Sequence, residues 1–191
     1  MIILKYGLYK NARNAAWQCL IDFKIKALPV NVSEIAAKSG IKIIKDSRVN
    51  LLKENQSGMT VEQEGKFYIV YKDTEAPERC RFTVAHELGH IFLGHLLTAV
   101  TACAYRTFTV QNDLESSANV FARDLLAPAC VLHELGTSSP EDIAKLCDIS
   151  LEASSIRAER LQLLEERGAW YLNPLERKVS KQFKKFVKQV K

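Results

Sequence analysis

The sequence predicts an α+β protein in which a small antiparallel sheet packs against helices. Stretches with apolar residues at helical spacing surround three short strand-like segments, without the regular strand–helix alternation of a parallel sheet. The chain has 191 residues, of which 47% are hydrophobic and 26% are charged, enough for a buried core. Pro and Gly are sparse, at 5 and 8 residues, so collagen-like, mucin-like and linker-dominated chains are excluded.

Helical signals dominate the first 40 residues. Apolar residues recur at helical spacing over residues 11–27, so a first amphipathic helix is expected there, ended by Leu-Pro-Val at 28–30. Ser33 is interpreted as the N-cap of a short helix that Gly40 closes.

Three strands are expected next. The first covers residues 41–44, and two more cover 59–63 and 66–72 after a turn at 56–58. Glu64 and Gly65 lie between the last two strands, and this two-residue link predicts a tight hairpin.

The second half of the chain reads as helical. A helix is expected over about 77–97, then an irregular or β-like stretch through Val110, then a helix over 112–126 that ends before Pro128. Ser139 and Ser150 each look like the N-cap of a further helix, the second running to about residue 167. This pair has the outline of a helix-turn-helix, but its second helix has few positive residues to meet phosphate, so a packing hairpin is favoured over a DNA-binding module.

The net charge of +5 belongs to the C-terminal tail. Residues 175–191 contain seven Lys or Arg and one Glu, whereas the rest of the chain has 20 basic and 21 acidic residues. One face of this tail is apolar, which favours a solvated amphipathic helix docked on the body. Binding of nucleic acid, an acidic partner or a membrane surface by the tail stays an open alternative.

The cysteine pattern and the hydropathy pattern predict a soluble cytoplasmic protein. The five cysteines are an odd number, widely spaced, with no C-x-x-C pair, which is typical of reduced thiols rather than of a disulfide framework or a zinc knuckle. The N-terminus has only a three-residue apolar run, too short for a secretory signal. No apolar stretch reaches the roughly 20 residues of a membrane span.

One segment has sharp chemical content: HELGHIFLGH at residues 86–95, which holds three of the four histidines. On a helix, positions i and i+4 share a face, so His86 and His90 can direct their imidazoles at one cation. Glu87 lies where its carboxylate can reach a water beside that cation. This is the arrangement of two histidines and a base found in zinc peptidases.

Such a site needs a third protein ligand. His95 lies five residues after His90, well round the helix, and is expected to be a capping or packing residue. Glu115, in the following helix, is the best candidate. The alternative for Glu115 is a capping box with Asn112 as N-cap, and spacing alone leaves both interpretations open.

Two motifs resemble those of the ImmA/IrrE-type metallo-endopeptidases. RCRFTVAHELGHIFLGH at 79–95 matches the R-F-T-x-A-H-E-L-G-H helix of that family, and ESSANVFARDLLAP at 115–128 matches its E-x-x-A-N-x-F-A-x-x-L-L-x-P segment. The looser resemblance extends over about residues 12–156. Ser117 is a departure, because many members carry a second acid there.

The resemblance implies a zincin-like fold with a Zn2+ ion held by His86, His90 and Glu115, and Glu87 as catalytic acid/base. It also implies an intracellular endopeptidase whose protein substrate is a helix-turn-helix repressor of a phage or mobile element. The alternative is a non-catalytic zinc-containing regulator that binds a transcription factor or DNA. The expected organisation is a metallopeptidase domain over 1–137, a helical hairpin over 138–173 and a basic tail over 174–191.

Several supporting roles stay open from the sequence. Asn119, one turn from Glu115, is a candidate for orienting an imidazole. Tyr105 and His133 could stabilise an oxyanion, but a structural role is favoured for each.

Overall fold

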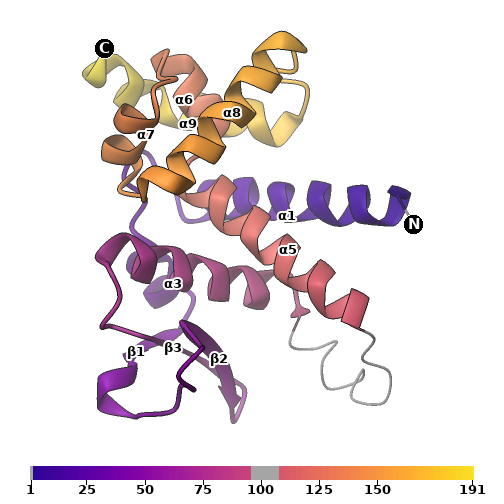
Figure 1. Ribbon diagram of the computed structural model, residues 1–191. Coiled ribbons are helices and arrows are strands. Elements are labelled where there is room, and N and C mark those ends of the chain that lie inside the picture. The colour runs from indigo at the N-terminus through magenta and orange to yellow at the C-terminus, as the bar shows by residue number, and fades with distance from the viewer. Residues whose placement is uncertain (1, 96–107) are drawn as a thin grey trace. The chain divides into compact units, whose positions relative to one another are not determined.

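The computed structural model describes residues 2–95 and 108–191, and it groups them into two compact units (Figure 1). The first unit is formed by Met1–Ala15 with Asn31–Ala122, and the second by Ala16–Val30 with Arg123–Lys191. Helix α1, Ile2–Asp22, and helix α5, Phe108–Leu126, each contribute residues to both units. The α+β class predicted from the sequence is confirmed.

The sheet of the first unit has three strands in the order β1-β3-β2. Strands β2, Gly58–Gln63, and β3, Lys66–Tyr71, form the predicted hairpin. Its turn residues Glu64 and Gly65 both have positive φ, at 52° and 72°, as a type I′ turn requires. Strand β1, Lys42–Lys45, pairs with β3 in parallel, so the sheet is mixed rather than wholly antiparallel as expected.

The short helix α2, Val32–Lys38, has a different N-cap from the predicted Ser33. Its N-cap is Asn31, whose side-chain oxygen accepts a hydrogen bond from the backbone N of Glu34 at 3.1 Å, and Ser33 lies inside the helix. Gly40, with φ 71°, follows the C-cap Ser39 and lets the chain turn into β1, as expected.

Helix α3, Pro77–Phe92, lies along one face of the sheet and contacts β2 and β3 (Figure 1). Pro77 occupies the first helical position and Glu78 lies in the first turn, both favourable at a helix N-terminus. The helix ends at Phe92, five residues earlier than predicted, and Gly94 has φ 72°. The prediction of an irregular or β-like stretch through Val110 is wrong for Phe108–Val110, which are helical. Residues 98–107 of that stretch lie outside the described residues.

A glycine lets α3 and α5 approach closely within the first unit. A Cβ added at Gly89 would lie 3.2 Å from the Cα and the carbonyl oxygen of Ala118 and from the ring of Phe121. Such contacts are tighter than side chains normally tolerate. Gly89 therefore sets the distance between the helix that carries His86 and His90 and the helix that carries Glu115.

In the second unit, the end of α1 packs with four further helices, and Ala16, Trp17 and Leu20 are buried. Helix α1 stops at Asp22, not at residue 27 as expected. Lys24 has φ 54°, and the backbone N atoms of Lys24 and Ile25 donate to the carbonyls of Ile21 and Leu20, which is a Schellman ending.

The four further helices are α6, Ala129–Leu135; α7, Pro140–Cys147; α8, Leu151–Glu166; and α9, Pro174–Val190. The predicted caps Ser139 and Ser150 are confirmed, since each side chain accepts a backbone hydrogen bond at 3.2 Å. Helix α7 packs against α8 and α6 packs against α9. The predicted hairpin thus corresponds to α7 with α8 and the predicted tail to α9; their standing as separate domains stays a prediction.

A buried ion pair lies in the core of the second unit. Arg157 of α8 is 1% exposed, and one of its Nη atoms lies 2.9 Å from the carboxylate of Asp124, which is itself buried. The Arg157 Nε also donates to the carbonyl of Ala127 at 2.6 Å. Burial lowers the pKa of Arg157, and the charge of Asp124 opposes that shift.

None of the helices in the described residues is long and apolar enough to cross a membrane.

Candidate metal centre

Helix α3 directs two imidazoles to the same side. His86 and His90 are one helical turn apart, and their rings are 4.7 Å apart between centroids. The opposite side of the helix packs in the interior, where Val84, Ala85 and Leu88 are buried. Burial of that apolar face fixes the rotation of α3, so both imidazoles are presented at its polar face.

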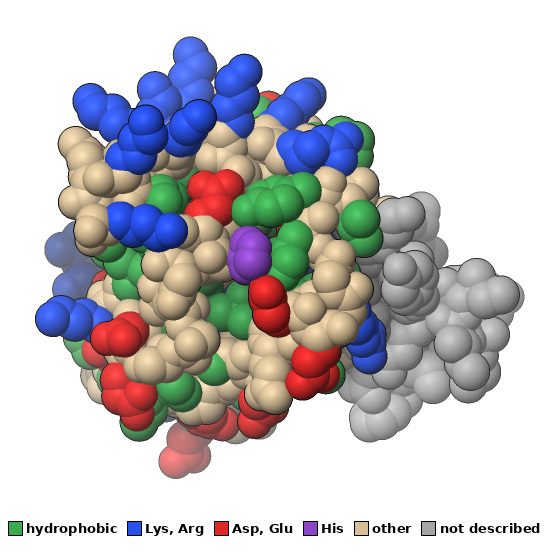
Figure 2. All heavy atoms as spheres, turned by 90° about the horizontal axis from the view of Figure 1, so that it is seen from above, with side chains coloured by type: hydrophobic (Ala, Val, Ile, Leu, Met, Phe, Trp, Pro, Cys, Tyr) green, Lys and Arg blue, Asp and Glu red, His purple; other side chains and the backbone are tan. Residues whose placement is uncertain are grey.

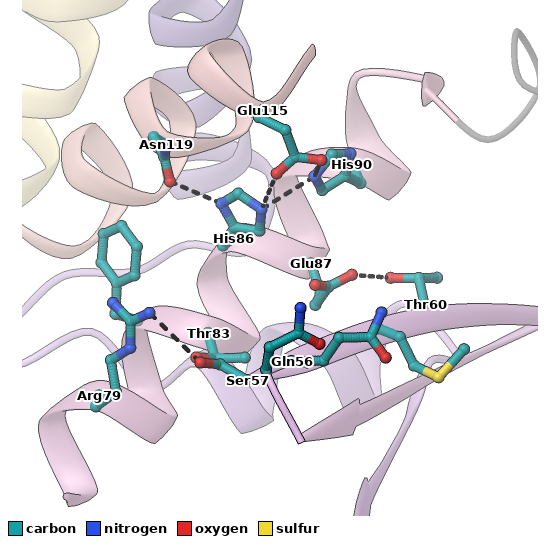
Figure 3. Close-up of a pocket in the computed structure, with 14 residues that line it drawn as sticks. Gln56, Ser57, Thr60, Arg79, Thr83, His86, Glu87, His90, Glu115 and Asn119 are labelled. Atoms are coloured by element: carbon teal, nitrogen blue, oxygen red, sulfur yellow. Dashed lines mark hydrogen bonds and ion pairs between the residues drawn. The ribbon is translucent and has the colours of Figure 1, made fainter. Parts of the chain in front are cut away.

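Glu115 of α5 completes a cluster with these two histidines (Figure 3). Its carboxylate oxygens lie 3.1 Å from His86 Nε2 and 3.5 Å from His90 Nε2, and the two Nε2 atoms are 3.0 Å apart. The three ligand atoms all lie within 4.8 Å of one another. Among the described residues this is the one group of three or more His, Cys, Asp or Glu with such spacing.

The other nitrogen of His86 is held by Asn119. His86 Nδ1 lies 2.8 Å from the amide oxygen of Asn119, one turn along α5 from Glu115. Since an amide oxygen accepts, Nδ1 donates to Asn119, and Nε2 is the nitrogen directed at Glu115. Asn119 therefore makes the contact that was a candidate from the sequence.

The other nitrogen of His90 begins a hydrogen-bonded chain. His90 Nδ1 lies 3.0 Å from His95 Nδ1, His95 Nε2 lies 3.2 Å from Ser117 Oγ, and Ser117 Oγ donates to the carbonyl of Leu114 at 2.9 Å. Because that carbonyl only accepts, a consistent assignment runs in one direction, with His90 Nδ1–H donating to His95 and His95 Nε2–H donating to Ser117. We call this the His95–Ser117 chain.

His95 has the burial expected of a packing residue and an additional role that spacing did not reveal. It is 7% exposed, and burial together with the neighbouring His90 lowers its pKa to about 4, so the ring is neutral at physiological pH. A neutral His95 can accept from His90 and donate to Ser117 at once. As predicted, His95 is not part of the three-ligand cluster.

This arrangement fits a cation. With Nδ1 of each ring directed at Asn119 and His95, both Nε2 atoms and the Glu115 carboxylate are directed at one another, and neutral imidazoles would offer a cation three acceptor atoms there. Hydrogen bonds with His86 and His90 hold the pKa of Glu115 well below its ordinary range, so it stays ionised. Burial lowers the pKa of His86, but the hydrogen bond and charge of Glu115 outweigh it and raise that pKa overall. The site favours positive charge at its centre.

Glu87 is held by the sheet rather than by the cluster. It is 8% exposed, and Thr60 of β2 donates to one of its carboxylate oxygens at 2.6 Å (Figure 3). Gly58, on the same strand, packs so closely that an added Cβ would lie 2.4 Å from a methyl carbon of Thr83. The absence of a side chain at residue 58 lets β2 approach α3 and bring Thr60 to Glu87.

These residues share one cavity of about 740 Å³ in the first unit. Its lining includes His86, Glu87, His90 and Glu115, with residues 55–60 forming the side toward the sheet. The buried carboxylate of Glu87 and the three-ligand cluster therefore line the same cavity.

The predicted site residues are distributed as follows. His86, Glu87, His90 and Glu115 line one cavity, and Asn119 joins them. The capping alternative for Glu115 is wrong, because α5 begins at Phe108 and Glu115 lies in its interior. His133 belongs to the second unit, where it stacks on Trp170 at 3.9 Å and lies 3.2 Å from Glu165, in keeping with the structural role favoured for it. Tyr105 lies outside the described residues.

Thr60 was not found from the sequence. It lies 27 residues before Glu87, and no local pattern marks a threonine on a strand as a partner of a helical carboxylate. Ser117 was noted only as a departure from the family pattern. Its contact with His95 arises because α5 packs against the end of α3.

Two imidazoles and a carboxylate around a centre that favours a cation, beside a second buried carboxylate, define a metallopeptidase-type site. The chain belongs to the peptidase M78 family: the model of that family, described as an IrrE N-terminal-like domain, matches residues 36–159, roughly two thirds of the chain. The predicted membership of the ImmA/IrrE metallopeptidases is thereby confirmed. No curated protein matches the chain at a significant level. Membership supports peptidase activity and implies a metal cofactor.

Proposed function

We propose that the chain is a zinc-dependent endopeptidase. The observation that carries the proposal is the convergence of three acceptors, His86 Nε2, His90 Nε2 and the Glu115 carboxylate, in the cavity that Glu87 also lines. Two imidazoles and one carboxylate are the protein ligands of a common class of catalytic zinc sites, which leave a further position open. Calcium and magnesium prefer oxygen ligands, so the two nitrogens favour zinc.

His86, His90 and Glu115 would hold the zinc ion. When bound, zinc supplies Lewis acidity, which activates water and polarises a carbonyl group. Asn119 and the His95–Ser117 chain orient the two imidazoles so that each Nε2 lone pair faces the centre of the cluster.

Glu87 is proposed as the acid/base. Its carboxylate would accept a proton from the attacking water and donate it to the amide nitrogen as the peptide bond breaks. Thr60 occupies one carboxylate oxygen by donating a hydrogen bond, and this contact fixes the orientation of the group. The other oxygen is left for the proton transfer. Residues 55–60 line the cavity beside Glu87, where the backbone of a peptide segment would lie.

The proposed substrate is a helix-turn-helix repressor encoded by a phage or mobile element. This part of the proposal is supported by the resemblance to the ImmA/IrrE family, whose members often cleave such repressors. A cavity of about 740 Å³ suits an extended segment rather than a folded domain, so cleavage is expected in an exposed loop or linker of the substrate.

The deciding experiment compares the wild type with Glu87→Gln. Gln keeps the size of the side chain but cannot take up a proton, so the variant should bind one zinc per chain by elemental analysis while cleavage of a co-incubated repressor is lost. Glu78→Gln is the matched control, because Glu78 lies on the same helix but does not line the cavity. Cleavage by Glu87→Gln at the wild-type rate would remove Glu87 from its role.

The non-catalytic alternative makes the opposite prediction. A regulator that only binds a transcription factor would form a complex with the repressor and leave it intact, with or without a chelator. Cleavage that stops on chelation and resumes when zinc is restored would exclude that alternative.

A further inference from the structure

Helix α9 of the second unit has two contrasting faces. Val179 and Phe183 are fully buried and Val187 is 7% exposed, and the helix packs against α6. Gln182 adds hydrogen bonds to the carbonyls of Leu20 and Ile25 at 2.7 and 2.5 Å. The apolar face of the tail is therefore buried in this unit, as the docked amphipathic helix favoured from the sequence requires.

The outer face of α9 is strongly basic. Seven side chains on it are exposed, and we call them the basic ridge: Arg177, Lys178, Lys181, Lys184, Lys185, Lys188 and Lys191. Five of the seven recur at alternating spacings of four and three residues from Arg177, so they form one row that runs for roughly 21 Å at 1.5 Å per residue. Figure 2 shows Lys and Arg side chains gathered along one edge of the face it draws.

No acid offsets this charge on the helix. The one acidic residue of α9, Glu176, is 5% exposed and lies on the buried side. Within residues 2–95 and 108–191, no salt bridge joins a ridge side chain to a carboxylate. The rest of the chain has 20 basic and 21 acidic residues, so the excess charge is concentrated here.

We propose that the basic ridge binds the phosphate backbone of duplex nucleic acid. Phosphates follow one another at about 3.4 Å of helix axis along each strand, so a ridge of roughly 21 Å lies along about six of them. Lys and Arg contacts to phosphate supply affinity and position without reading sequence. Insertion of α9 into a membrane interface would require its apolar face to be free, and that face is buried.

The helical hairpin does not offer an equivalent surface. The exposed side of α8 carries Glu152, Glu159, Glu165 and Glu166, which would be repelled by phosphate, and Arg157 points into the core. Binding through the ridge is therefore expected to be independent of sequence. It does not depend on the metal centre, and it would concentrate the protein on DNA, where a repressor substrate is also found.

The test is a titration of the full chain against a labelled duplex of about 20 base pairs at several salt concentrations between about 50 and 200 mM. The variant Lys181→Gln/Lys184→Gln/Lys188→Gln removes three charges of the row. Its control, Lys26→Gln/Lys53→Gln/Lys66→Gln, removes three exposed lysines elsewhere and leaves the same net charge. The ridge variant should bind at least about tenfold more weakly, and the slope of log K against log salt should fall by about 2.7, at 0.9 per lost contact. The control should bind like the wild type.

Three results would overturn the proposal. One is no binding of the duplex by the wild type at about 50 mM salt. Another is equally weakened duplex binding in the ridge variant and in its control, which would show that binding depends on net charge alone. The third is binding to vesicles of phosphatidylserine and phosphatidylcholine, or to polyglutamate, that is tighter than binding to the duplex. Circular dichroism of each variant checks that α9 remains folded. Because binding is measured without metal, the result is independent of peptidase activity.

Discussion

At the scale of single residues, the proposed metal centre depends on side chains outside the three-ligand cluster. Asn119 and His95 each engage the Nδ1 atom of one proposed ligand, and so decide which nitrogen of each ring is free. The His95–Ser117 chain ends on a backbone carbonyl, which can only accept, and this gives the whole chain a direction. The carbonyl of Leu114 thus fixes the tautomer of His90, acting through Ser117 and His95.

His95→Ala should weaken zinc binding by about 10- to 100-fold, the usual effect of losing the partner of a histidine ligand. His95→Asn should retain most of the affinity, because its amide oxygen can take the place of Nδ1 as acceptor. Competition titration with a chromophoric chelator measures both. Wild-type affinity in His95→Ala would mean that the chain does not orient His90.

The buried thiol of Cys130 is expected to make the protein less stable at alkaline pH. Burial, followed by the charge of Glu176, raises the pKa of its thiol from 9.0 to about 12. Between these values the unfolded chain loses the proton and the folded chain keeps it, so the free energy of unfolding falls as pH rises from about 9 toward 12. By pH 10 the loss in the free energy of unfolding amounts to roughly 1.4 kcal/mol.

Urea denaturation of the wild type and of Cys130→Ala at pH 7, 8, 9 and 10 measures this linkage. The variant is less stable at every pH because it leaves a cavity, but the two curves should converge above about pH 9. Curves that stay parallel would show that the thiol titrates normally in the folded protein.

At the scale of elements, the distance between α3 and α5 decides whether Glu115 reaches the two histidines. Gly89→Ala would place a methyl group 3.2 Å from the Ala118 backbone and the Phe121 ring. Since α5 must move away, we expect a loss of about 1–3 kcal/mol in stability and weaker zinc binding. Thermal denaturation with and without zinc measures both. A more stable variant, as helix propensity alone would give, would contradict this account.

The elements whose signals are local were predictable from the sequence. Ser139 and Ser150 cap their helices, and Glu64-Gly65 forms the hairpin turn, because each depends on neighbouring residues only. The spacing of His86 and His90 likewise follows from helix geometry alone, and the family motifs supplied Glu115.

Features that depend on distant contacts were missed. The parallel pairing of β1 with β3 depends on how α2 and β1 are placed against the hairpin, which no local pattern records. Phe108–Val110 prefer extended structure by local propensity, yet they are helical because they continue α5. Thr60 and Ser117 became site residues only through the packing of β2 and α5 against α3.

At the scale of the whole molecule, stability depends on charge in the interior as well as on apolar packing. Asp124 is the carboxylate partner of the buried Arg157, and it also lies 2.7 Å from Arg123. Asp124→Ala would leave a fully buried guanidinium without a counterion, and we expect a loss of about 3–5 kcal/mol in the free energy of unfolding.

The double variant Asp124→Leu/Arg157→Leu should be considerably less destabilised, since both charges are removed together. Glu159→Ala, which removes an exposed acid from α8, is the control and should change stability by less than about 0.5 kcal/mol. Chemical denaturation provides all three values. A double variant as unstable as Asp124→Ala would mean that the hydrogen bonds from Arg157 to Ala127, rather than the missing counterion, dominate.

The hydrogen bonds from Gln182 to Leu20 and Ile25 have a practical consequence for truncation. They tie the last helix of the chain to a segment near its beginning, and residues 16–30 supply core side chains to the unit formed by 123–191. A fragment cut to the family match at 36–159 would lack Gln182 as well as Leu20 and Ile25, and so would lose these hydrogen bonds. The boundaries of sequence similarity are therefore poor boundaries for expression, and fragments should keep both ends together.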